Sequence, residues 1–178
     1  MLISDAYREQ IRLLHQLQEG WGESNQLAIV KQIQFAILLG TKDVLDYGCG
    51  KGQLAHYFPW PIKEYDPGIP GKENGNVPAY FVICHDVLEH IEPEYLEEVL
   101  KDLHRCTKQV LFVTIALAPA EAILPDGRNA HLIIQPMEWW ETRLKQYFYV
   151  VSRVHITKPE NKTEVELILV PKKDIEIC

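Results

Sequence analysis

The first forty positions carry apolar residues at the spacing of an α-helix. Ser4 can cap a helix whose apolar positions lie three or four residues apart, at Tyr7, Ile11, Leu14 and Leu17. Ser24 can begin a second helix that ends at Gly40, with an inward face formed by Leu27, Val30, Ile33 and Ile37. The pattern therefore predicts two N-terminal helices.

From residue 41 onward, short apolar runs alternate with helical patterns. We expect strands at Val44–Tyr47, Ile62–Tyr65, Tyr80–Cys84, Val110–Ala116, Tyr149–Thr157 and Glu164–Val170. We expect helices at Gln53–Phe58, Glu94–Cys106 and Pro136–Tyr147. This alternation predicts an α/β fold, a Rossmann-like doubly wound sheet of about six strands, closed by an antiparallel hairpin of the last two strands.

Length and charge narrow the class of protein. A chain of 178 residues suits a single domain, residues 1–178, with a helical cover at 1–40 and a core at 41–178. The formal net charge of −7 argues against a broad surface for duplex nucleic acid. The chain has neither a long charge-poor apolar run nor a basic leader, so we expect a cytoplasmic protein without a membrane partner.

Three glycines occupy five positions between the first expected strand and its helix. Gly48, Gly50 and Gly52 would lie in the crevice at the carboxyl end of that strand, where open α/β sheets bind ligands. Asp66 ends the second expected strand, and a carboxylate at this position can accept hydrogen bonds from both hydroxyls of a ribose. A tight turn without a ligand is the alternative, and the G-x-G-x-G spacing disfavours a dinucleotide site.

Three motifs in register resemble class I S-adenosylmethionine-dependent methyltransferases. They are D-Y-G-C-G-K-G at 46–52, E-Y-D-P at 64–67 and I-C-H-D-V-L-E-H-I-E-P at 83–93, and the resemblance covers roughly Thr41 to Val170. It implies S-adenosylmethionine as cofactor. It implies Asp46 near the amino group, Gly48 and Gly50 near the methionine part, Asp66 on the ribose, and Asp86 and Val87 near the adenine or the sulfonium. The other residues expected to bind the cofactor are Gly52, Pro67 and His85, and His85 can also be a simple strand-end residue near the adenine.

The chain departs from this family between Asp66 and Tyr80. Only about 13 residues separate them, whereas the family fits a helix, a strand and another helix there. We therefore expect the third strand of the usual fold to be missing or rudimentary.

Asp86, Glu89 and His90 stand at i, i+3 and i+4, and one helical turn would align them. Together with the later His131, they resemble the divalent-metal site of Hen-type RNA 2′-O-methyltransferases and of ubiquinone-pathway O-methyltransferases. The resemblance implies Mg²⁺, Mn²⁺, Fe²⁺ or Zn²⁺ on these four residues, with Glu89, His90 and His131 as catalytic residues. Asp86 is one methylene shorter than the family's first ligand, and metal-independent methyltransferases use a similar motif to line the pocket.

The acceptor side offers weaker signals. Arg128 and Asn129 can hold a polar acceptor or form a turn, Trp139 can stack on one, and Trp21 can cover the cleft or pack in the core, as can Tyr7 and His15. The sequence thus predicts a methyltransferase acting on a hydroxyl of a polar acceptor, either a sugar, a ribose terminus or a small molecule, with a nitrogen acceptor as the less favoured choice. A non-catalytic S-adenosylmethionine-binding regulatory or partner protein is the alternative.

Overall fold

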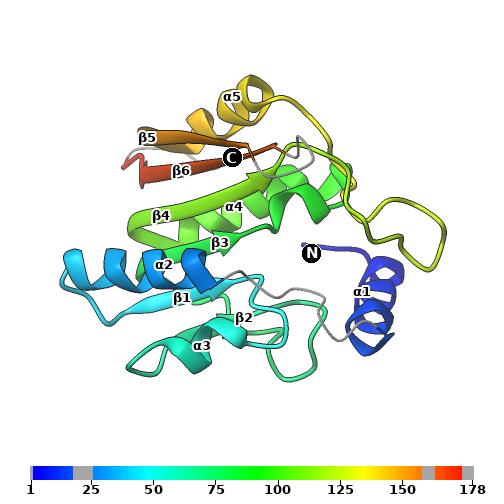
Figure 1. Cartoon of the computed structure of the whole chain (residues 1–178), viewed down its shortest axis with the longest axis horizontal. Helices are drawn as coiled ribbons and strands as arrows, with labels where there is room; N and C mark the ends of the chain where they lie inside the picture. Colours follow the sequence, from blue (N-terminus) through cyan, green and yellow to red (C-terminus); the bar gives the residue numbers. More distant parts are fainter. Residues whose placement is uncertain (1, 18–25, 158–162, 174–178) are drawn as a thin grey trace.

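The computed structural model describes residues 2–17, 26–157 and 163–173, and it contains a six-stranded sheet of order β2-β1-β3-β4-β6-β5 (Figure 1). The strands are β1 Val44–Tyr47, β2 Lys63–Tyr65, β3 Ala79–His85, β4 Thr107–Ala116, β5 Phe148–Thr157 and β6 Thr163–Pro171. The α-helices are α1 Asp5–Leu17, α2 Gln26–Leu38, α3 Gln53–Tyr57, α4 Leu96–Cys106 and α5 Met137–Tyr147. Short 3₁₀ turns occupy Leu88–His90 and Pro93–Tyr95.

The first four strands of the sheet are parallel, and β6 pairs antiparallel with both β4 and β5. Parallel strands need crossover connections, and the sheet supplies them through α3 and α4. The predicted Rossmann-like sheet of six strands with a closing antiparallel hairpin is therefore confirmed.

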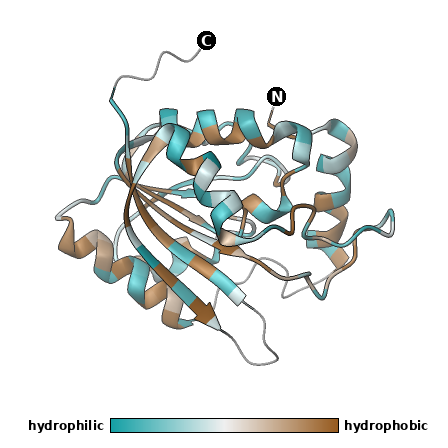
Figure 2. Cartoon of the chain, turned by 90° about the horizontal axis from the view of Figure 1, so that it is seen from above, coloured by the Kyte–Doolittle hydropathy of each residue, from teal (hydrophilic) through white to brown (hydrophobic). Residues whose placement is uncertain are grey.

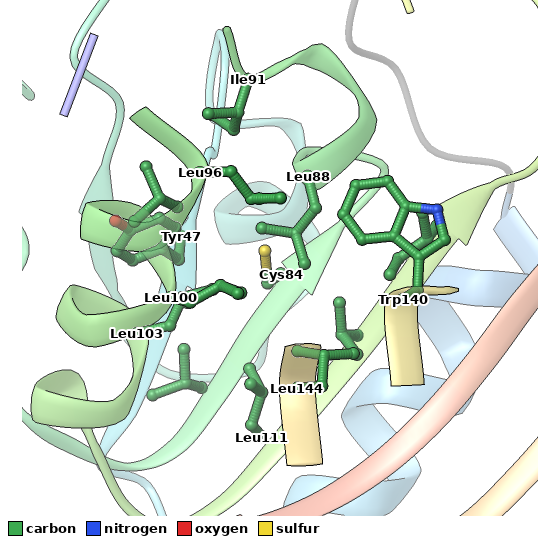
Figure 3. Packing of buried hydrophobic residues seen from close by; sticks show 14 of the residues in the cluster. Tyr47, Cys84, Leu88, Ile91, Leu96, Leu100, Leu103, Leu111, Trp140 and Leu144 are labelled. Carbon is green, nitrogen blue, oxygen red and sulfur yellow. The ribbon is translucent and has the colours of Figure 1, made fainter. Parts of the chain in front are cut away.

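Two apolar cores form on the two faces of the sheet, because successive strand residues point to opposite sides. Leu45, Val82 and Leu111 pack against α4 and α5, whereas Val44, Phe81 and Phe112 pack with residues of α2 and α3. Figure 3 shows the first of these cores around Cys84, with side chains from α4 and α5 on either side. The apolar colour is concentrated along the central strands in Figure 2.

The second helix buries a different face from the one that its spacing predicted. Ile29, Gln32 and Ala36 are buried in α2, while Leu27 and Ile37 are exposed. The helix is apolar on several sides, so the periodicity could not select the inward face. Packing on the sheet selected it instead.

The connection between β2 and β3 contains no helix and no strand, so the predicted loss of the third strand is confirmed. Its backbone closes on itself where the Asp66 amide donates to the Lys72 carbonyl at 3.1 Å. Gly75 then approaches β2 so closely that a Cβ there would lie 1.9 Å from the carbonyl oxygen of Glu64. The irregular segment thus packs directly on the short edge strand.

Helix α1 lies beyond the carboxyl ends of the parallel strands (Figure 1), whereas α2 packs on a face of the sheet. Ser4 donates through its amide (2.8 Å) and its hydroxyl (2.7 Å) to the Glu92 carboxylate, and the Tyr7 hydroxyl donates to the His90 carbonyl. These bonds fix α1 over the turn that carries Glu89 and His90. No helix in the described ranges has the length and apolar character needed to cross a membrane.

Candidate functional site

A cavity of about 250 Å³ opens at the carboxyl ends of the parallel strands, beneath α1. Its wall is formed by the glycine loop after β1, the segment after β2, the segment after β3 and residues of α1. Of the residues that the sequence singled out for the cofactor, the lining includes Gly48, Gly50, Asp66, Pro67, His85, Asp86 and Val87. The position agrees with the crevice expected for an open α/β sheet.

The backbone of the glycine loop borders the cavity with positive φ angles, which favour glycine. Gly48, Gly50 and Gly52 have φ angles of 81°, 51° and 86°. A Cβ on Gly48 would lie 2.3 Å from a methyl carbon of Val87, so a side chain there would displace the cavity wall. Gly52 caps the start of α3 and does not line the cavity, so its expected contact with the cofactor stays a prediction.

The carboxylate of Asp66 ties the two sides of the cavity together. Its oxygens accept from the Gly50 amide at 2.9 Å and from the Gly68 amide at 2.8 Å. Burial raises its pKa, while these two amides, His15 and Lys72 lower it. Asp66 therefore lies where a ribose could reach it, already oriented by backbone donors.

Asp46 is buried in β1 and does not line the cavity. Burial, then the neighbouring Glu64 and Asp66, raise its pKa to about 8. Asp46 thus lies buried in the strand beside Glu64, and its expected contact with the cofactor amino group stays a prediction.

Asp86 has a φ of 52°, the left-handed region that few side chains adopt. Thr114 holds it there: its hydroxyl donates to Asp86 Oδ1 at 2.9 Å, and the Asp86 amide donates to the Thr114 hydroxyl oxygen at 3.0 Å. His85 Nε2 lies 3.5 Å from the other carboxylate oxygen. Strain of this kind is often held at functional sites.

Three of the four predicted metal ligands come together. Ligand atoms of Glu89, His90 and His131 all lie within 4.8 Å of one another. The two imidazole rings meet edge to face with their centroids 4.7 Å apart. His90 and His131 also line the cavity, so this group of three residues adjoins the region of the glycine loop.

The hydrogen bonds of the two histidines define their tautomers. His90 Nδ1 lies 2.8 Å from the Ala130 carbonyl oxygen, and His131 Nδ1 lies 2.5 Å from that of Ala118. A carbonyl only accepts, so each Nδ1 carries a proton, and a neutral ring of this tautomer has its lone pair on Nε2. Burial, then His131, lowers the pKa of His90 to about 4, which keeps that ring neutral near pH 7. Metal-ligating histidines are typically oriented in this way.

Glu89 is fully buried beside these rings. One carboxylate oxygen accepts from the Ala116 amide at 2.7 Å, and the other has no hydrogen-bond partner in the described part of the chain. Burial, then Asp86, raises its pKa well above the ordinary value. A buried oxygen of this kind suits a bound cation, so these three residues fit a divalent metal.

Asp86 does not join this group, and its expected alignment with Glu89 and His90 is wrong. The 3₁₀ turn begins only at Leu88, and the left-handed Asp86 precedes it. The carboxylate is held by Thr114 instead. The spacing i, i+3, i+4 aligns side chains only inside a continuous helix, which the sequence could not guarantee.

Of the expected acceptor residues that the structure describes, Arg128, Asn129 and Trp139, none lines the cavity. Arg128 forms an exposed ion pair with Asp126 at 2.7 Å, and Trp139 stacks under Arg143 in a separate groove beside α4. Trp21 lies outside the described residues. Tyr7 and His15 of α1 line the cavity, as one of their two expected roles had it. Ile11 of α1 and Ile3, just before the helix, also line it, and the sequence had not singled out either residue for the cleft.

Asn129 has a structural role. Its side chain accepts from the Ala120 amide at 3.0 Å and from the His131 amide at 2.9 Å, and it donates to the Ala120 carbonyl at 2.8 Å. All three bonds go to the backbone of the loop that carries His131. The expectation that Asn129 binds the acceptor is therefore replaced by one in which it shapes this loop.

Comparison with known proteins agrees with the fold. A family model described as a methyltransferase domain matches residues 13–158, so the chain belongs to this family. The resemblance to class I S-adenosylmethionine-dependent methyltransferases is confirmed. No curated protein matches the chain.

Solved structures share the fold at low sequence identity. The 1,6-didemethyltoxoflavin-N1-methyltransferase of Burkholderia thailandensis, with bound S-adenosylhomocysteine, has a TM-score of 0.67 and 15% identity over 94% of this chain and 89% of its own. The N-methyltransferase NodS of Bradyrhizobium japonicum, also with S-adenosylhomocysteine, has a TM-score of 0.68 and 11% identity over 95% and 100%. The methyltransferase domain of a bacterial Hen1 has a TM-score of 0.57 and 16% identity over 83% and 100%.

Proposed function

We propose that the chain is an S-adenosylmethionine-dependent methyltransferase that methylates a hydroxyl of a polar acceptor with the help of a divalent metal. The acceptor would be a sugar, a ribose terminus or a small molecule. The observation that carries the proposal is the convergence of Glu89, His90 and His131 within 4.8 Å beside a cavity that also contains Asp66 and the glycine loop.

The cofactor side of the proposal uses the loop after β1 and the end of β2. Gly48 and Gly50 would border the methionine part, and a Cβ at Gly48 would collide with Val87 in the cavity wall. Asp66 would accept the ribose hydroxyls, and His85 and Val87 would border the adenine or the sulfonium. S-adenosylmethionine supplies an electrophilic methyl group that a nucleophilic oxygen can accept.

On the acceptor side, Glu89, His90 and His131 would hold the metal. A divalent cation lowers the pKa of a bound hydroxyl and orients it. The two Nδ1–H bonds to Ala130 and Ala118 keep both Nε2 atoms in the state that binds metal. The segment from Leu2 to Ile11 covers the cavity and would exclude water from it.

The test combines titration calorimetry with an activity measurement. We expect S-adenosylmethionine and S-adenosylhomocysteine to bind, and Asp66→Ala to weaken binding by about 1.5–3 kcal/mol, the range for hydrogen bonds to a charged group. Methylation of an identified acceptor should be lost with EDTA and restored by Mn²⁺ or Mg²⁺. His131→Ala should abolish turnover while leaving cofactor affinity nearly unchanged.

The outcomes separate the parts of the proposal. Unchanged affinity in folded Asp66→Ala would contradict the cofactor assignment, and activity that survives EDTA would contradict the metal. His90 or His131 would then be tested as a general base, since a neutral ring with its lone pair on Nε2 can take a proton. Cofactor binding without turnover on any acceptor would favour the non-catalytic alternative.

A nitrogen acceptor is the second candidate. Two structures with the same fold are described as N-methyltransferases. A neutral amine carries its own lone pair and needs no acidification by a metal. Metal-independent methylation of an amine would therefore favour this candidate over the hydroxyl.

A further inference from the structure

The shortened connection between β2 and β3 places a lysine against the cofactor loop. Lys72 Nζ lies 3.0 Å from Glu64 Oε1 on β2 and 3.4 Å from the carbonyl oxygen of Gly50 in the glycine loop. A Cβ on Gly52 would lie 2.2 Å from Glu64 Oε1 and 2.5 Å from Lys72 Nζ. The Glu64–Lys72 pair is thus packed directly on the glycine loop.

The backbone of the connection fixes where this lysine lies. The Asp66 amide donates to the Lys72 carbonyl at 3.1 Å, and the Lys72 amide donates to the Ile69 carbonyl at 3.0 Å. Gly75 packs on the backbone of Glu64 immediately afterwards. Lys72 is therefore held on both sides by close backbone contacts, and it is only 22% exposed in its side chain.

The surroundings of Lys72 are acidic. Asp46 and Asp66 are buried nearby, and Glu64, the hydrogen-bond partner of Lys72, lies beside Asp46 in register. Lys72 lowers the pKa of both aspartates, against the effect of burial. Without a positive charge here, Glu64 and Asp66 would repel each other and raise the pKa of Asp46 further, under the loop that is taken to hold the cofactor.

We propose that Lys72 is a positioning residue for the cofactor, which ties the glycine loop to β2 and neutralises the carboxylates beneath it. The inference rests on the proposed function, because the loop is taken to bind S-adenosylmethionine. It assigns a role to the segment that replaces the usual strand. Lys72 touches the loop and the acids, and acts on the cofactor through Gly50 and Asp66.

The matched control is Lys63, the first residue of β2. Lys63 also forms an ion pair, with Asp43 at 2.5 Å, and also holds the same connection, through the Pro78 carbonyl at 2.9 Å. Neither lysine lines the cavity, but the contacts of Lys63 go to Asp43 and Pro78, whereas Lys72 reaches Gly50 of the glycine loop. Lys63→Met therefore removes a comparable pair and tether without touching the glycine loop.

The experiment measures S-adenosylhomocysteine binding by titration calorimetry, with chemical unfolding as a parallel readout. We expect Lys72→Met to weaken binding about tenfold, since a charge-assisted hydrogen bond is lost. Lys72→Arg should retain most of the affinity, and Glu64→Gln should restore part of it in the Lys72→Met background. Lys63→Met should bind as the wild type does, even where it lowers the free energy of unfolding.

Two results would overturn the inference: wild-type affinity in Lys72→Met, or an equal loss of affinity in Lys63→Met. If Lys72→Met does not fold, Lys72→Gln replaces it in the same series. A wild-type protein that binds no S-adenosylhomocysteine would instead contradict the proposed function. The failure of one proposal is therefore distinguishable from the failure of the other.

Discussion

At the scale of single residues, Asn129 fixes the loop that positions the His131 ring. The Asn129 amide group makes three hydrogen bonds to the backbone of residues 120 and 131, and His131 Nδ1 donates to the Ala118 carbonyl. The side chain thus closes the loop whose carbonyl orients the His131 ring. The role follows from the partners of Asn129, all of which lie in the backbone.

Asn129→Ala should weaken Mn²⁺ binding by about 10–100-fold, the usual cost of removing a group that orients a metal ligand. S-adenosylhomocysteine affinity should stay nearly unchanged, because Asn129 does not line the cavity. Titration calorimetry measures both. Arg128→Ala is the control, since its side chain is exposed and pairs with Asp126 in the same loop. Equal Mn²⁺ affinity in the wild type and Asn129→Ala would refute the role.

At the scale of elements, α5 is joined to the edge strand β5 by one buried acid. Glu141 accepts from Lys145 at 2.6 Å and from Arg153 of β5 at 2.8 Å. The hydrogen bond from Lys145 is the main cause that lowers the pKa of Glu141, and Arg153 adds to it. The Glu141–Arg153 ion pair anchors β5, whose other side chains are largely exposed.

A group with a lowered folded pKa stabilises the protein above its ordinary pKa and loses this effect as the pH falls through the lowered value. Glu141→Gln should therefore reduce the free energy of unfolding by about 1 kcal/mol at neutral pH, since both cations are half exposed. The difference should disappear below the lowered folded pKa of Glu141. Urea unfolding at several pH values tests this, with Glu138→Gln on the same helix as the control. A deficit that persists at low pH would argue against the ion pairs.

At the scale of the whole molecule, the cavity joins elements that are distant in sequence. Residues of α1, the glycine loop, the segment after β3 and His131 share its wall. A ligand bound there contacts several parts of the fold at once and binds only the folded state. Its binding free energy therefore adds to the stability of the whole domain.

S-adenosylhomocysteine at 100 times its dissociation constant should raise the free energy of unfolding by about 2.7 kcal/mol. For a chain of this size the melting temperature should rise by about 5–10 °C. Scanning calorimetry with Asp66→Ala, measured at the same ligand concentration, provides the comparison, and the shift should shrink in the variant. A wild-type protein whose melting temperature does not respond to the ligand would contradict the cavity assignment.

The sequence by itself determined the sheet and its cofactor end. Short apolar runs, helical patterns between them and glycines at a strand end are local patterns, and each constrains the backbone where it stands. The short sequence separation between Asp66 and Tyr80 also determined the loss of the third strand, because 13 residues cannot form a helix, a strand and another helix. These features could be predicted without knowledge of what packs on them.

Only the tertiary structure decided which side chains meet. The inward face of α2, the separation of Asp86 from Glu89 and His90, and the backbone partners of Asn129 all depend on contacts with distant segments. Lys72 lay in a segment whose sequence indicated only an irregular wall, and the close packing of Gly75 on β2 brought it to the glycine loop. Local pattern fixes backbone conformation, whereas the geometry of a site is set by long-range packing, which a linear pattern does not encode.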